Sequence, residues 1–386
     1  MILVPGTCSE NAATLENQGW AQQAVPGSAP RVSIGLPVYN GERYLAESLE
    51  SLLAQTFTDF ELIISDNAST DRTEEICRAY AARDPRIRYY REEANHGMAW
   101  NFNRVFALAR GEYFKWAAYD DLHAPTFLAR CVEALDQDPD ILWCMPRFTH
   151  VGPAGMPLNE PWTWDVGYAP DAECVAPGEK AARPPDSRHS NSPSRRFRAV
   201  LLADGSCLDN YALVRREIMA RTSLQVPYYG GDKVFVAELC LHGRYRQLPE
   251  TLFFVRAHPE GSGALVTAAE QQHFMNPRRS ARFSFTRLHL LISYLRAVGR
   301  ARLSLVQRVL CLWAIGLYLF QVKKWGHVLR RIISGAGTGG GYREAAERFA
   351  AAKTASRPRT PPTETRAQGS EWLPGGKSLM AGGHHG

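Results

Sequence analysis

The chain has 386 residues, of which 45% are hydrophobic and 22% charged, the balance of a globular protein with a substantial core. Its length allows two average domains or one large α/β domain with extensions. The formal net charge of +6 is unevenly placed, because no Asp or Glu occurs between Gln271 and Arg343. Since no recognised nucleic-acid-binding module accompanies this charge, we expect no nucleic-acid partner.

Both ends of the chain differ from its middle. Residues 1–30 lack hydrophobic periodicity and a signal-peptide core, so we expect a disordered N-terminal segment. Residues 334–386 are rich in Gly, Pro, Thr and Arg, which predicts a disordered tail. The eight cysteines are scattered, without a C-x-x-C pair, and several lie in apolar contexts. We therefore expect buried, reduced thiols in a cytoplasmic protein rather than disulfides or a zinc site.

Between these ends, residues 31–262 alternate between strand-like and helix-like segments. Short apolar runs predict strands at 32–36, 60–64, 87–90, 113–118, 141–145, 211–214 and 251–255. Apolar residues at helical spacing predict helices at 45–55, after Asp71, and at 97–109, 125–135, 196–202, 216–222 and 233–241. This alternation predicts a mostly parallel sheet covered by helices on both faces. The Pro- and Gly-rich stretch 152–194 breaks the pattern, and we expect it to be a long surface loop.

Polar residues gather where the expected strands end. These clusters are residues 37–42, 66–71, 120–121 and 231–232, the last followed by Arg256 and His258. In parallel α/β sheets the carboxyl ends of the strands bind ligands. The adjacent carboxylates Asp120 and Asp121 are hard oxygen donors that suit Mg²⁺ or Mn²⁺ carrying a phosphorylated substrate. Each aspartate taken alone could equally be a turn former or a helix cap. It is the coincidence of several polar clusters with strand ends that indicates a binding site.

In order and position, these clusters resemble the inverting family-2 glycosyltransferases, which have the nucleotide-sugar-binding GT-A fold. The resemblance covers about residues 31–262. Its motifs are Pro37-Val38-Tyr39-Asn40-Gly41-Glu42, the segment 63–73, Asn95-His96-Gly97, the segment 118–125, Gly231-Asp232 and Arg256-Ala257-His258. Two positions depart from the family. Ala118 stands where the metal motif usually has its first Asp, and Gly231 replaces an acidic residue before the expected base.

The resemblance implies a role for each motif. Asp232 would be the general base that takes the proton of the acceptor hydroxyl, which an inverting displacement requires; its alternative role is a helix N-cap. Asp120, assisted by Asp121 and with His258 nearby, would hold Mn²⁺ or Mg²⁺ beside the diphosphate. Asp66 would accept a hydrogen bond from the N3–H of a uracil or thymine ring. The remaining nucleotide-binding residues would be Pro37, Tyr39, Glu42 and Asn95.

The expected activity is metal-dependent, inverting transfer of a sugar from a UDP-, dTDP- or GDP-sugar to a hydroxyl group. The acceptor would be a saccharide or a lipid-linked molecule, in polysaccharide or glycoconjugate synthesis. A catalytically silent nucleotide-sugar-binding scaffold is an alternative, motivated by Ala118 and Gly231. Nucleotidyl transfer to a sugar phosphate is another, but it expects a Gly-rich, basic loop after the first strand, and residues 38–41 do not form one.

A basic segment, residues 271–333, follows the expected domain and contains an apolar run at 309–320. Twelve residues are too few for an ordinary transmembrane helix, which needs about twenty. Basic residues on both sides, with Trp and Tyr in the run, favour a helix lying on an anionic membrane surface over residues 303–325. A helix docked on the domain with a solvated basic face is the alternative. The expected location is cytoplasmic, with peripheral contact at the inner face of the plasma membrane.

Overall fold

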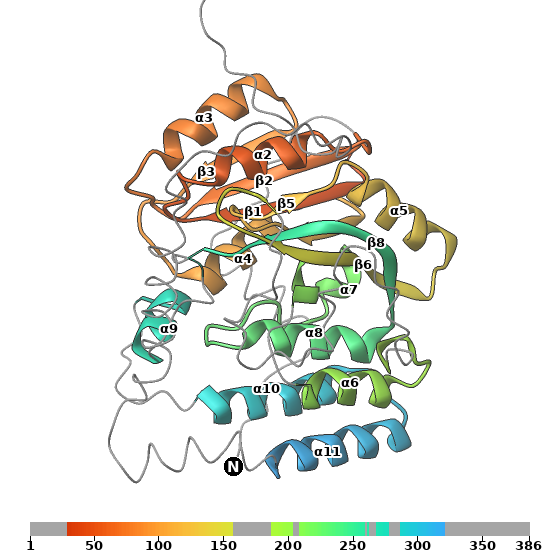
Figure 1. The fold of residues 1–386 in the computed structure, drawn as a ribbon. Coiled ribbons are helices and arrows are strands. Elements are labelled where there is room, and N and C mark those ends of the chain that lie inside the picture. The colour runs from red at the N-terminus through yellow and green to blue at the C-terminus, as the bar shows by residue number, and fades with distance from the viewer. Residues whose placement is uncertain are drawn as a thin grey trace, which may run out of the picture. The chain divides into compact units, whose positions relative to one another are not determined.

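A computed structural model describes residues 29–156, 187–203, 208–258, 261, 268–277 and 286–320. All of them belong to one compact unit, residues 1–339. The expected disordered segments, apart from residues 29 and 30, and most of the expected loop 152–194 lie outside the described residues. Within the unit an eight-stranded sheet has the order β3-β2-β1-β4-β7-β6-β8-β5 (Figure 1).

The first half of the sheet is parallel. Its strands are β1 (Val32–Val38), β2 (Phe60–Asp66), β3 (Ile87–Arg91) and β4 (Tyr113–Trp116). Every residue of β1, β2 and β4 is buried, which explains why these strands are mostly apolar rather than alternating. The connecting helices are α2 (Leu45–Leu53), α3 (Thr73–Arg83) and α4 (Met98–Ala107). With α2 and α3 on one face and α4 on the other, both faces are covered (Figure 1).

The second half of the sheet is mixed. Its strands are β5 (Leu122–His123), β6 (Ile141–Val151), β7 (Leu213–Arg215) and β8 (Arg244–Arg256). β7 is antiparallel to both β4 and β6, β8 is parallel to β6, and β5 is antiparallel to β8. β6 and β8 are longer than the sequence predicts, because their partly exposed polar residues interrupt the apolar runs. The sequence does not predict β5, because its two residues are too few to show the alternating pattern of a strand.

Pro37 lies inside the central strand β1, although the sequence predicts that the strand stops before it. The carbonyl of Gly35 accepts a hydrogen bond from Ala117 N at 2.8 Å. The backbone N–H and C=O groups of Gly35, and of every second residue along β1 from it, therefore point toward β4. Pairing with β4 ends opposite Gly35, two residues before Pro37. The proline therefore costs no ladder hydrogen bond at this point.

Helices are layered on the α4 side of the sheet. They are α8 (Gly231–His242), α6 (Pro193–Leu202), α10 (Thr286–Arg300) and α11 (Leu305–Leu319). α8 meets the sheet where the rings of Phe235 and Trp116 lie 4.9 Å apart. α6 and α10 pack on α8, and α11 packs on both of them (Figure 1). The remaining helical segments are α5 (Phe127–Gln137), α7 (Arg216–Met219), α9 (Ala268–Met275) and the 3₁₀ turns Ser187–His189 and Leu208–Tyr211.

A lysine is buried in the core beneath the end of β4. Lys115 Nζ donates to the carbonyl of Trp116 at 2.9 Å and lies 2.9 Å from His123 Nε2. Burial lowers the pKa of Lys115 to about 7. Burial also lowers the pKa of His123, and the nearby Lys115 lowers it further. The pair therefore carries little positive charge at alkaline pH.

Replacing Lys115 with Met tests this burial. Between pH 7 and 10.5 the lysine of the unfolded chain holds a proton that the folded chain releases. The free energy of unfolding of the natural protein should therefore rise with pH relative to Lys115→Met, by up to ~1.4 kcal/mol per pH unit. Urea titrations at several pH values in this window measure it, and a difference that does not change with pH would contradict the assignment.

Candidate functional site

The structure joins the loops that follow β1 and β2. Asn40 N donates to Ser69 Oγ at 2.9 Å, and Glu42 N donates to Asp71 Oδ2 at 3.0 Å. Glu42 in turn accepts from Arg72 N at 3.0 Å. Asp71 Oδ1 also accepts from Thr73 N, so it supports the start of α3 although the N-cap position is Arg72. Glu42 thus holds the two loops together.

Asp66, at the end of β2, is completely buried. Its Oδ1 accepts from Ser69 N at 2.8 Å, and its Oδ2 accepts from the hydroxyl of Tyr89 at 3.0 Å. Burial raises the pKa of Tyr89, and the charge of Asp66 raises it further. A carboxylate offers about four acceptor positions. Arg91 Nε also lies 3.6 Å from Oδ2, which leaves Asp66 one position for a further donor.

The other expected nucleotide-binding residues differ in exposure. Pro37 is buried in β1, whereas the ring of Tyr39 is 42% exposed and stands beyond the strand end. Asn95 Oδ1 accepts from Asn67 Nδ2 at 2.9 Å and from Gly97 N at 2.8 Å, which links the turn before α4 to the end of β2. Gly97 has φ 89°, and a Cβ there would lie 2.5 Å from a backbone oxygen of α9. This turn therefore requires glycine.

The paired carboxylates after β4 meet the end of β8. Asp121 is 4% exposed, and its Oδ1 accepts from the backbone N–H of Arg256 at 2.9 Å. Asp120 Oδ2 lies 2.8 Å from Nε2 of His258, which is also buried. The expected metal-binding side chains Asp120, Asp121 and His258 are thus brought together from positions more than 130 residues apart.

The side chain of Arg256 anchors this corner of the site. Its Nε donates to the carbonyl of Asp120, and its Nη1 donates to the carbonyl of Pro153, both at 2.8 Å. Its Nη2 donates to Glu47 Oε2 at 2.6 Å. The guanidinium also lies 4.8 Å from the ring centre of Tyr44, which packs against His258. Arg256 therefore fixes the backbone that carries both carboxylates.

The electrostatics of the carboxylate pair favour a cation. Burial raises the pKa of Asp121 well above its ordinary value, and the charge of Asp120 raises it further. Among the described residues, no group of three or more His, Cys, Asp or Glu side chains is placed to hold a metal ion by itself. Mg²⁺ is commonly bound by one or two carboxylates together with substrate phosphates. The donor set therefore fits a divalent cation that is shared with a diphosphate.

Asp232 lies in the first turn of α8. The N-cap is Gly230, and no side chain caps the helix, so Asp232 does not have the cap role that the sequence left open. A Cβ on Gly231 would lie 2.7 Å from Val226 Cγ2 and 2.9 Å from its carbonyl oxygen. Tight packing therefore explains why this chain has glycine where the family usually has an acidic residue.

Tyr211 is a site residue that the sequence analysis did not identify. Burial raises the pKa of its phenol well above the ordinary value, and the charges of Asp121, Asp120 and Asp232 raise it further. The charges of three carboxylates, two from the loop after β4 and one from α8, therefore act on one phenol. No motif marks Tyr211, because it ends a short 3₁₀ turn and reaches its neighbours only through the fold.

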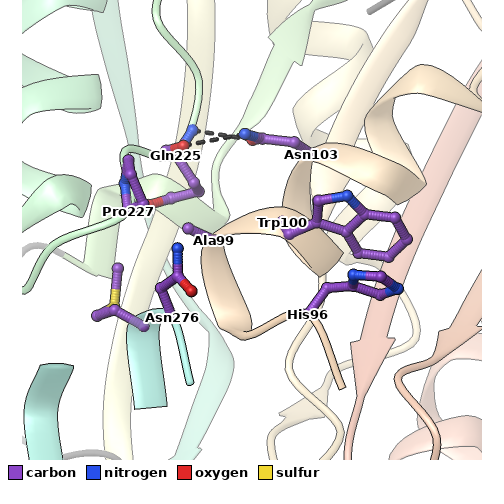
Figure 2. Close-up of a pocket in the computed structure, with 8 residues that line it drawn as sticks. His96, Ala99, Trp100, Asn103, Gln225, Pro227 and Asn276 are labelled. Atoms are coloured by element: carbon purple, nitrogen blue, oxygen red, sulfur yellow. Dashed lines mark hydrogen bonds between the residues drawn. The ribbon is translucent and has the colours of Figure 1, made fainter. Parts of the chain in front are cut away.

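A cavity of about 350 Å³ opens between α4 and the loop that leads to α8 (Figure 2). Its lining residues are His96, Ala99, Trp100, Asn103, Gln225, Pro227, Met275 and Asn276. The rings of His96 and Trp100 are stacked, with centres 4.2 Å apart. Asn103 bridges the two walls through hydrogen bonds to the backbone of Gln225. Aromatic faces beside amide groups have the chemistry that binds sugars.

Comparison with known proteins identifies the domain. Residues 33–219 match the family model for glycosyl transferase family 2. They form a family-2 glycosyltransferase domain. Over 111 residues the chain is 40% identical to the putative glycosyltransferase EpsE of Bacillus subtilis, covering 28% of this chain and 40% of that protein. Over 112 residues it is 32% identical to the glycosyltransferase GlyG of Streptococcus pneumoniae, covering 29% and 37%. The alignments thus span well under half the length of these relatives.

A solved structure supports the fold of the family-2 domain. The chain resembles residues 1–349 of S. aureus TarS, solved in complex with UDP-GlcNAc, with a TM-score of 0.52 and 18% identity. The similarity covers 78% of this chain and 75% of that one. At this identity the likeness concerns the fold alone. The predicted GT-A fold is confirmed.

Replacing Arg256 with Met tests its anchoring role. Loss of the guanidinium leaves Glu47 and two partly buried carbonyl groups without their donor, so we expect the free energy of unfolding to fall by about 1–3 kcal/mol. Arg72→Met, at an exposed ion pair with Glu75, is the matched control and should leave it almost unchanged. Urea denaturation measures both; equal effects would show that Arg256 is not an anchor.

Proposed function

We propose that this protein is a metal-dependent, inverting glycosyltransferase that uses a nucleoside-diphosphate sugar. The observation that carries the proposal is the meeting of Asp120, Asp121, Arg256 and His258 beyond the end of β4, in a family-2 glycosyltransferase domain. Asp120 lies beside the imidazole of His258, and together with Asp121 it fits a cation with a diphosphate. Asp232 lies on the separate helix α8 and does not have the N-cap role.

The donor would bind along the ends of β1, β2 and β4. Asp66 accepts from a ring N–H of the base, and the exposed ring of Tyr39 packs against the nucleoside. Pro37, Glu42 and Asn95 shape the loops around it. Asp120 and Asp121, with His258 beside them, hold Mn²⁺ or Mg²⁺, which neutralises the charge of the departing diphosphate. The donor is a UDP-, dTDP- or GDP-sugar.

Asp232 would act as the general base. Its carboxylate accepts the proton of the acceptor hydroxyl as the hydroxyl oxygen bonds to the anomeric carbon. The bond from that carbon to the diphosphate oxygen breaks on the opposite face, so the configuration inverts. Burial and the charges of the three carboxylates raise the pKa of the Tyr211 phenol, which therefore stays protonated. Its proton stays in place throughout.

The acceptor would be a saccharide or a lipid-linked molecule, in polysaccharide or glycoconjugate synthesis. The cavity beside Trp100 supports a sugar acceptor, since its aromatic and amide lining lies between the Asn95 turn and the loop before Asp232. We place the reaction in the cytoplasm, at the inner face of the plasma membrane. The silent scaffold, motivated by Ala118 and Gly231, has the weaker support, because packing against Val226 accounts for Gly231.

Replacing Asp232 with Asn tests the proposed base. Release of nucleoside diphosphate from the best donor of a UDP-, dTDP- and GDP-sugar panel should fall by about 10²–10⁴-fold, because the amide cannot take the proton. Binding of the nucleotide should be retained. Asp140→Asn, at a carboxylate that is 84% exposed, is the control and should leave both unchanged.

Two results would count against the proposed base. Full turnover by Asp232→Asn would exclude Asp232 from the role. Nucleotide binding by the natural protein with no turnover across a broad donor and acceptor panel would favour the scaffold.

Replacing Trp100 with Ala tests the acceptor cavity. Loss of the stacked ring should raise the KM for a saccharide acceptor by about tenfold, equivalent to ~1.4 kcal/mol. The KM for the donor should not change, because Trp100 lies on the face of α4 that points toward the cavity (Figure 2). Initial rates with each substrate varied in turn separate the two. An equal rise in the KM for the donor would show that the cavity does not serve the acceptor alone.

A further inference from the structure

The outer face of α11 is apolar and exposed. One side of the helix is buried against α6 and α10 through Cys311, Ala314, Ile315 and Tyr318. The other side, here called the outer face, consists of Leu305, Val306, Val309, Leu310, Leu312, Trp313, Leu319 and the adjoining Phe320, all exposed. Trp313 is 65% and Phe320 79% exposed. α11 is therefore apolar on both sides although only one side is covered by described residues.

Such a helix is unusual at a protein surface. A helix that is apolar all round is ordinarily enclosed by protein or by lipid. A large contiguous apolar patch on a surface marks contact with a partner or a membrane. α11 is also firmly attached, because Gln307 Oε1 accepts from Ser194 N at 3.0 Å and from Ser192 Oγ at 3.1 Å. None of the described helices is long and apolar enough to span a bilayer.

The charge around the outer face identifies its partner. Residues 286–320 contain five arginines and no Asp or Glu. Arg300 is paired with Glu238, and Arg287 donates to the hydroxyl of Tyr318. Arg296, Arg302 and Arg308 are exposed. Lys323, Lys324, Arg330 and Arg331 follow in the sequence. A second copy of this face would bring like charges together, whereas an anionic lipid surface would attract them.

We propose that the outer face of α11 lies in the interface of an anionic lipid bilayer. Its apolar side chains enter the boundary between headgroups and acyl chains, and Trp313 sits at the headgroup level. Arg302 and Arg308 contact the lipid phosphates. The helix lies on the membrane and does not cross it. The proposal concerns binding alone and holds whether or not the domain transfers sugar.

Vesicle flotation of the full chain tests the proposal. The protein should float with vesicles of phosphatidylcholine and phosphatidylglycerol at low salt, and much less with phosphatidylcholine alone or at high salt. The double variant Val309→Glu, Trp313→Glu should lose at least about tenfold in partitioning, because carboxylates would enter the lipid boundary. Arg302→Gln and Arg308→Gln should each lower it by about fivefold. Met156→Glu, at an apolar residue that is 60% exposed away from α11, should float like the natural protein.

Three outcomes would overturn the proposal. The natural protein could stay unbound with anionic vesicles. The double variant could float as well as the natural protein. Light scattering could show a dimer that the double variant converts to monomers, which would assign the outer face to a second copy. Nucleotide binding, measured on the same samples, shows separately whether each variant is folded and whether the sugar-transfer site is intact.

Discussion

Two adjacent carboxylates at the end of a buried strand set the main physical constraint on this structure. Asp121 is almost fully enclosed, and the charge of Asp120 beside it makes its ionised form still less favourable. Burying a charge is costly unless a partner compensates for it. The backbone N–H of Arg256 supplies one hydrogen bond, but it carries no full charge. A cation that arrives with a diphosphate would supply the rest.

This constraint links the two halves of the sheet. Arg256 comes from β8, in the mixed half, yet it holds the backbone of Asp120 and reaches Glu47 on α2. His258, two residues later, meets the carboxylate of Asp120. The end of β8 therefore closes the side of a site that begins on the parallel half. The contact of Phe235 with Trp116 holds α8, the helix that carries Asp232, against β4.

Much of this could be predicted from the sequence, and the rest depends on contacts through space. The buried parallel strands are mostly apolar, so their positions and the polar residues after them were predictable. β5 is too short for a pattern, and polar residues such as Arg147 and Gln247 hide the true lengths of β6 and β8. Tyr211 joins the site only through folding. The membrane-facing hypothesis for 303–325 stays a prediction, although the docked helix exposes an apolar rather than a basic face.

The central claim is that the carboxylates after β4 hold a divalent cation together with a nucleoside diphosphate. Calorimetric titration with UDP, dTDP and GDP, each with and without Mn²⁺, tests it most directly. The account predicts that one nucleotide binds at least about tenfold more tightly with Mn²⁺, and that Asp120→Asn removes this gain. Nucleotide binding that is indifferent to Mn²⁺, or a gain that survives in Asp120→Asn, would contradict it.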